Sequence, residues 1–189
     1  MRKLFAFVLA ALTLVFMTVP FGSTAEAARV AVVPLQCNEK KVERWADFNS
    51  YYWDIIIEKF KYPEYELMDD EKVEAVVPET GLLSYDRETL MKLAKDLDAE
   101  IVVAMKLDEV SERMLNFRRE QAIATFMQGE YASYNRLSDN YYHNKIYEKG
   151  EVLEVLTLRN DWQQSTFASE FKRCVNRTLE DKSRNKKKK

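Results

Sequence analysis

Hydrophobic and polar positions alternate along residues 29–68 in a way that predicts a strand, a helix and a second strand. Residues 29–36 (RVAVVPLQ) are apolar on both faces, which is typical of a strand covered on two sides. Residues 65–68 form a short second strand. Between them, residues 41–60 place large apolar side chains at spacings of three and four, as in an amphipathic helix: Val42, Trp45, Phe48, Tyr52, Ile56 and Phe60.

Two more helices and a third strand follow. An acidic cap at Asp69 or Asp70 begins a helix that runs to about Val77, before a proline and a glycine. Asp86 caps the next helix. That helix leads to a buried strand over residues 101–107 (IVVAMKL), and its apolar stripe consists of Leu90, Leu93, Ala94 and Leu97.

The pattern changes to extended segments in the second half of the chain. Strands are expected over residues 120–134, 140–148 and 151–158, with a turn at Lys149-Gly150, and a final helix begins at Asn160. The fold class predicted is α/β. It is a single domain whose mixed β-sheet has helices packed on it, in the order βαβααβ followed by a β-meander and a C-terminal helix.

Residues 1–27 predict a secretory signal peptide. The basic pair Arg2–Lys3 precedes an unbroken apolar run, Leu4–Val19, and Ala25-x-Ala27 supplies the small residues of a cleavage site. This run of 16 residues is shorter than the roughly 20 that cross a bilayer, so a cleaved leader is favoured over an uncleaved membrane anchor. We expect an exported protein, periplasmic or extracellular, whose mature chain begins at Ala28 and carries no lipoprotein cysteine.

Charge divides the mature chain into an acidic domain and a basic tail. Residues 28–181 carry 21 basic and 30 acidic side chains, a net charge of −9, and suit one domain. Residues 182–189 (KSRNKKKK) carry six positive charges and are expected to be disordered. Such a tail acts as a solubilising end or makes weak contact with anionic lipid or polymer.

The chain has two cysteines, Cys37 and Cys174, near the beginning and the end of the domain. An even number of cysteines in an exported protein predicts one disulfide between them. In the chain-entropy model a loop of this size stabilises the fold by on the order of 4 to 5 kcal/mol. If the two Cα atoms lie more than about 7 Å apart, the bridge does not form and two thiols remain.

Sequence motifs for cofactor, metal or covalent chemistry are missing. The mature chain has three glycines, Gly81, Gly129 and Gly150, which excludes a GxGxxG fingerprint and a P-loop. His143 is the one histidine and there is no GxSxG elbow, so a surface histidine is favoured over a Ser-His-acid hydrolase. We therefore expect no cofactor, no metal site and no enzymatic activity.

Acidic side chains cluster at residues 69–71 and 96–100, which leaves an acid-pair glycoside hydrolase open as a third interpretation. The first cluster lies where a helix should begin. A favourable interaction with the helix dipole explains it better than catalysis does. Nothing in the sequence selects a catalytic pair.

Half of the ten tyrosines lie within residues 131–147 (YASYNRLSDNYYHNKIY). Tyrosine is enriched at protein interfaces and in sites that stack on sugars, so these five are candidate partner-binding residues. Tyrosine also has a high strand propensity, and cross-strand aromatic pairs can stabilise a hairpin without binding anything. Both interpretations are open for each of Tyr131, Tyr134, Tyr141, Tyr142 and Tyr147.

The order of the segments resembles the CsgG/LpoB/TolB-N-terminal group of envelope domains. The resemblance covers most of residues 29–181 and rests on RVAVVPLQ, the amphipathic helix, YELMDD, LAKDLDAEIVVAMKL and NDWQQSTFASEFKRCVNRTLED. It implies a non-enzymatic domain that docks on other envelope proteins, as an outer-membrane assembly factor or as an activator of a cell-wall synthase. The chain lacks the lipobox cysteine of such members and an obvious pair of membrane-spanning hairpins, so no pore-forming role is expected and no family site residue is carried over.

These observations together predict an exported cell-envelope protein that binds another envelope protein through its tyrosine-rich hairpin. A module that binds cell-wall glycan through the same tyrosines is the alternative. No nucleic-acid partner is expected.

Overall fold

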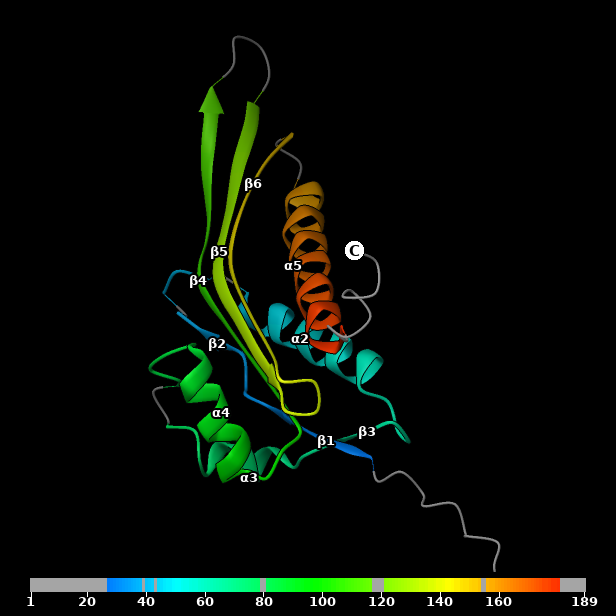
Figure 1. Ribbon diagram of the computed structural model, residues 1–189. Coiled ribbons are helices and arrows are strands. Elements are labelled where there is room, and N and C mark those ends of the chain that lie inside the picture. Colours follow the sequence, from blue (N-terminus) through cyan, green and yellow to red (C-terminus); the bar gives the residue numbers. More distant parts are fainter. Residues whose placement is uncertain are drawn as a thin grey trace, which may run out of the picture.

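The fold is described from a computed structural model (Figure 1). It describes residues 27–180 except for 39, 43, 79, 80, 117–120, 154 and 155. The predicted signal peptide, apart from Ala27, and the predicted basic tail lie outside the described residues.

The described chain forms a mixed α/β domain, which confirms the predicted fold class. Six strands form one sheet, and four helices pack on it. In chain order the elements are β1 (Ala28–Val32), β2 (Gln36–Cys37), α2 (Trp45–Lys59), β3 (Tyr65–Leu67), α3 (Asp70–Glu74), α4 (Arg87–Asp96), β4 (Ile101–Asn116), β5 (Gln121–Asn135), β6 (Asn140–Leu153) and α5 (Leu156–Leu179).

The sheet combines a short parallel part with a long antiparallel part. Its strand order is β3-β1-β4-β5-β6, and β2 pairs with β4 beside β1. β1 runs parallel to both neighbours, so that Val30 lies between Leu67 of β3 and Ile101 of β4. β4, β5 and β6 are antiparallel and form the predicted meander.

Helices cover the two faces of the sheet separately. α2 and α5 pack on one face, called here the α5 face, and α3 and α4 pack on the other, called the α4 face (Figure 1). Successive strand residues point to opposite faces. Val30 and Val32 of β1 therefore join the core under α2 and α5, while Ala31 and Val33 join the core under α3 and α4. This explains why the first strand is apolar on both sides.

Aromatic side chains hold α2 and α5 together over the α5 face. The rings of Tyr52 and Phe171 stack with their centroids 4.7 Å apart, and Phe48 meets Phe167 edge-on at 5.4 Å. The Tyr52 hydroxyl donates a hydrogen bond to the carbonyl oxygen of Val33 at 2.8 Å, so this buried polar group is satisfied.

Asp69 and Asp86 both occupy N-cap positions, as predicted, but only Asp86 makes a capping hydrogen bond with its side chain. Asp86 caps α4, and its carboxylate accepts a hydrogen bond from the backbone N–H of Thr89 at 2.7 Å. Asp69 is the N-cap of α3, but its side chain makes no capping hydrogen bond and instead pairs with Lys72 at 3.0 Å.

The second half of the chain corrects two sequence predictions. β4 has 16 residues and continues well beyond residue 107, because β5 pairs with it along its whole length. The predicted turn at Lys149-Gly150 is wrong, since β6 runs straight through it and Gly150 pairs with Thr125. A Cβ built on Gly150 would lie 2.2 Å from the ring of Trp162. The glycine therefore allows α5 to approach the strand.

The last helix also differs from its prediction. α5 begins at Leu156, four residues before the predicted Asn160 cap. The segment 151–158 was expected to form a separate strand, but its first three residues belong to β6 and its last three to α5.

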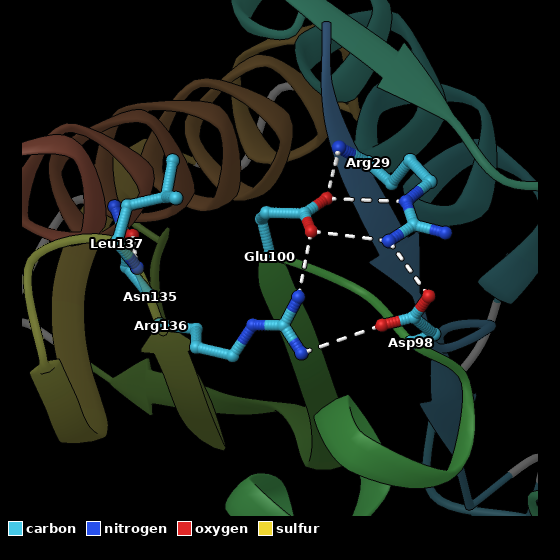
Figure 2. Close-up of polar contacts among 6 residues, drawn as sticks. All are labelled: Arg29, Asp98, Glu100, Asn135, Arg136 and Leu137. Atoms are coloured by element: carbon cyan, nitrogen blue, oxygen red, sulfur yellow. Dashed lines mark hydrogen bonds and ion pairs between the residues drawn. The ribbon is translucent and has the colours of Figure 1, made fainter. Parts of the chain in front are cut away.

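Four charged side chains join three distant segments at one end of the sheet (Figure 2). Glu100 accepts hydrogen bonds from the backbone N–H of Arg29 at 2.7 Å and from the guanidinium of Arg136 at 2.7 Å. Arg29 also pairs with Glu100 at 3.2 Å and with Asp98 at 2.9 Å. The cluster ties the start of β1 to the α4–β4 turn and to the β5–β6 turn.

This cluster predicts a pH dependence of stability. Burial acts to raise the pKa of Glu100, but hydrogen bonds and charge from Arg29 and Arg136 outweigh it and lower the pKa below its usual value of 4.5. Stability from such a group is present above the unfolded pKa and is lost as the pH falls through the folded pKa. We expect Glu100→Gln to lower the free energy of unfolding by about 1–3 kcal/mol at pH 7.

Urea denaturation at pH 7 and at pH 3 would measure this difference. The difference between the wild type and Glu100→Gln should be smaller at pH 3 than at pH 7, because protonation at low pH removes the charge that the variant lacks. Asp54→Asn, at an exposed position of α2, is the matched control and should change stability by less than about 0.5 kcal/mol. If Glu100→Gln lowered the free energy of unfolding as much at pH 3 as at pH 7, the stabilisation by Glu100 would not be electrostatic.

Candidate functional site on the β5–β6 hairpin

The five predicted tyrosines do not share one surface. Because side chains alternate along a strand, Tyr131 and Tyr142 point to the α5 face, whereas Tyr134, Tyr141 and Tyr147 point to the α4 face. The five tyrosines are close together in sequence, but their side chains are divided between the two faces of the sheet.

Tyr131 is part of the core. Its side chain is fully buried, and its ring meets Phe171 edge-on at 5.9 Å. The Thr178 hydroxyl donates to the carbonyl oxygen of Cys174 at 3.2 Å, so it accepts from the Tyr131 hydroxyl at 2.6 Å. Burial raises the pKa of Tyr131 well above its usual value, which keeps the phenol neutral.

Three further tyrosines also have structural contacts. Tyr142 is half-buried and packs against the core of the α5 face. The buried Tyr134 donates a hydrogen bond to Asp139 at 3.1 Å, within the β5–β6 turn. Tyr141 donates to the carbonyl oxygen of Tyr85 at 2.7 Å and so ties β6 to the segment that precedes α4. These contacts explain the three residues without a partner molecule.

Tyr147 differs from the other four because 63% of it is exposed. The strand register places it on the face of β6 opposite α5. The long strands β4, β5 and β6 extend well beyond α4 (Figure 1). Gln128 of β5 lies directly across from Tyr147. Among the five candidates, Tyr147 is the side chain that a partner could contact without displacing another group.

Two lysines flank Tyr147 on the same face. Lys145 and Lys149 lie two residues before and after it, so all three side chains point the same way. Lys149 lies over the ring of Phe126, 5.8 Å from its centroid, and pairs with Glu151 at 3.4 Å. Lys145 is exposed and lies directly across from Glu130 of β5, which pairs instead with Lys106. We call Phe126, Gln128, Lys145, Tyr147 and Lys149 the open face.

A charged cluster lies between the open face and α4. Glu130 of β5 is 2.7 Å from the Nε2 atom of His143 and 3.0 Å from the Nζ atom of Lys106. Burial acts to raise the pKa of Glu130, but its two hydrogen-bonded neighbours outweigh this and lower it. The same hydrogen bond between Lys106 and Glu130 raises the pKa of Lys106. Glu130 is thus paired with both of its charged or polar neighbours, His143 and Lys106. The ring of His143 also stacks on the ring of Tyr141.

The sequence does not indicate this cluster, because its members are far apart along the chain and only the strand register brings them together. His143 itself is exposed on a strand, as the sequence predicted for a surface histidine. Over the described residues, no group of three or more His, Cys, Asp or Glu side chains is placed to hold a metal ion.

The cysteines correct the prediction of a disulfide. Cys37 lies in β2 opposite Leu107, whereas Cys174 lies on α5, where its Sγ accepts a hydrogen bond from Asn144 of β6 at 3.7 Å. Since β4 and β5 separate β2 from β6, three strand spacings of about 4.8 Å put those strands about 14 Å apart. A disulfide needs Cα atoms within about 7 Å. Both side chains are thiols, and burial raises the pKa of Cys174 to about 11.

A cavity of about 420 Å³ lies where the chain leaves β1. Gln36 lines it and accepts a hydrogen bond from the Tyr85 hydroxyl at 2.9 Å, while its amide nitrogen is buried without a partner. Because that nitrogen is fully covered, a ligand in the cavity could reach it only if the amide moved. The cavity therefore offers a binding volume but no exposed polar group at this position.

No helix within the described residues is both long enough and apolar enough to span a membrane.

Comparisons with known proteins find resemblance only among solved structures. No family model and no curated protein matches the chain. A putative neuraminyllactose-binding hemagglutinin homolog from Helicobacter pylori matches 84% of this chain and 88% of its own, at 10% identity and a TM-score of 0.47. The lipoprotein GNA1162 from Neisseria meningitidis matches 74% and 94%, at 11% identity and a TM-score of 0.42.

The C-terminal domain of LpoB from Escherichia coli is also similar. It matches 75% of this chain and 93% of its own, at 11% identity and a TM-score of 0.36. LpoB is one of the proteins that the sequence resembles. At these identities and scores the similarity assigns neither a family nor a function to the chain, and the CsgG and TolB parts of the resemblance stay predictions.

Proposed function

We propose that this protein is an exported, non-enzymatic cell-envelope protein that binds another envelope protein through the open face, with Tyr147 at its centre. One observation carries the proposal: Tyr147 is 63% exposed between two lysines, while the other four tyrosines of the hairpin have structural contacts. The export part of the proposal rests on the leader sequence.

A large exposed aromatic side chain on a sheet surface suits protein docking. Tyrosine is enriched among the few residues that supply most of the energy of an interface, because its large, rigid ring can be buried at low entropic cost. The residues around Tyr147 are half-buried or charged, as in a partly polar contact surface. A glycan site would instead need several exposed rings along a groove, and one exposed tyrosine on a sheet face does not provide that.

Site-specific crosslinking in intact cells tests the proposal. A photoreactive phenylalanine analogue at position 147 should give one discrete protein adduct, which mass spectrometry then identifies. The same analogue at Met91 is the matched control, because Met91 is also exposed but lies on α4, away from the open face. The same adducts from both positions, or no protein adduct from position 147, would contradict the proposal.

A further inference from the structure

We infer that the outer edge of β6 takes up an extended, acidic segment of the partner as an additional strand of the sheet. This inference rests on the proposed function, because it names the kind of segment that would bind beside Tyr147.

The first observation is an unpaired strand edge. The sheet ends at β6, and in the described part of the chain no strand pairs with the outer side of its 14 residues. Half of the backbone N–H and C=O groups of such a strand point away from its one neighbour, here β5. The strand at the opposite end of the sheet, β3, has only three residues. β6 therefore offers the longest template for strand addition.

The second observation is that α5 lies on the face of β6. Asn144 donates to the sulfur of Cys174, and Gly150 lies against Trp162, both on the α5 face. At its beginning β6 is held by Asn140, whose side chain donates to the carbonyl oxygen of Arg177 at 2.9 Å. The helix thus contacts the strand through side chains that point to one face. No strand in the described part of the chain covers the outer edge of β6.

The third observation is the charge pattern along that edge. Residues that lie directly opposite each other on neighbouring strands share a face, and opposite charges there are favourable. A segment paired with β6 would meet Lys145, Tyr147 and Lys149 at every second position. The partner segment that complements these three residues has an acidic residue opposite each lysine and an apolar residue opposite Tyr147, with any residue at the positions between.

The same pattern disfavours one register of pairing with a second copy of this chain. If two β6 strands paired antiparallel with their Tyr147 residues opposite each other, Lys145 of each copy would face Lys149 of the other. Like charges directly opposite each other are destabilising. The ion pair of Lys149 with Glu151 does not prevent binding of an acidic segment, because such exposed pairs contribute little and exchange readily.

Fluorescence anisotropy with the mature protein and labelled synthetic peptides tests the inference. The probe is Ser-Glu-Thr-Val-Thr-Glu-Ser, and a peptide with lysine in place of both glutamates is its control. We expect the acidic peptide to bind at least about tenfold more tightly than the basic one. The double variant Lys145→Glu, Lys149→Glu should reverse this preference, while Lys92→Glu on α4 should leave it unchanged.

Backbone methylation distinguishes strand addition from simple charge attraction. One acidic peptide carries N-methyl groups on Glu, Val and Glu, and a second carries them on the two threonines. Only alternate N–H groups of an added strand face the sheet, so one of the two peptides should lose binding and the other should keep it. If both bind equally well, the inference is overturned.

The outcomes also separate this inference from the proposed function. If no acidic peptide binds while position 147 still crosslinks to one protein, the strand-addition inference fails and the proposed function stands. If the peptides show the alternating effect of methylation but position 147 captures no protein, the proposed function fails and the edge of β6 remains a peptide-binding strand.

Discussion

Replacing Tyr131 with alanine is expected to lower the free energy of unfolding by about 3–5 kcal/mol, the usual cost of truncating a large buried aromatic side chain. Tyr131 is fully buried between β5 and α5, and its ring contacts that of Phe171. The change would open a cavity and also remove a hydrogen bond to the buried Thr178 hydroxyl. Urea denaturation followed by circular dichroism would measure the loss.

A more conservative change separates the two contributions. Tyr131→Phe keeps the ring and removes the hydroxyl, so we expect a loss of about 1 kcal/mol. Ser133 remains within 2.6 Å of the Thr178 hydroxyl and limits the effect. Tyr147→Ala is the matched control on β6, and at this exposed position it should change stability by less than about 0.5 kcal/mol. Equal stability of Tyr131→Ala and the wild type would contradict the structural role of Tyr131.

Tyr147→Ala is expected to weaken binding of the partner that crosslinks at this position by about 2 kcal/mol or more, roughly 30-fold in the dissociation constant. The reason is that an exposed aromatic ring at the centre of an interface is buried only when the partner binds. Titration of the purified partner against the wild type and the variant, by calorimetry or anisotropy, would measure this.

Two further variants make the result specific. Tyr147→Phe should retain most of the affinity if the ring carries the energy, because it removes only the hydroxyl. Met91→Ala changes an exposed apolar residue on α4 and should leave affinity unchanged. Unchanged affinity in Tyr147→Ala, or a loss that appears only together with unfolding, would exclude Tyr147 as the centre of the interface.

The contrast between these two tyrosines shows what strand geometry adds to composition. The sequence placed both in one cluster, where docking and cross-strand packing were both open interpretations. Their roles separate because Tyr131 points to the face that α5 covers, whereas Tyr147 points to the other face and is exposed there.

The elements of the first half of the chain could be predicted from the sequence, because each depends on neighbouring residues. The apolar run of β1, the stripe of α2 and the cap at Asp86 are local patterns, and the cap forms as predicted. The predicted strand 29–36 is divided between β1 and β2, and α2 begins only at Trp45, because Val42 pairs with Val110 of β4. The open face also has a local signal, since Lys145, Tyr147 and Lys149 are spaced by two along one strand.

The tertiary structure decided the features that depend on pairing between distant segments. β4 and β6 are longer than predicted because each pairs with β5 beyond the predicted end. Gly150 was expected in a turn, but it lies within β6, where its lack of a side chain lets Trp162 of α5 pack against the strand. Cys37 and Cys174 stay apart because β4 and β5 lie between β2, which carries Cys37, and β6, which contacts Cys174 of α5. Register decides these features through contacts between residues far apart in sequence, which local hydrophobic periodicity does not encode.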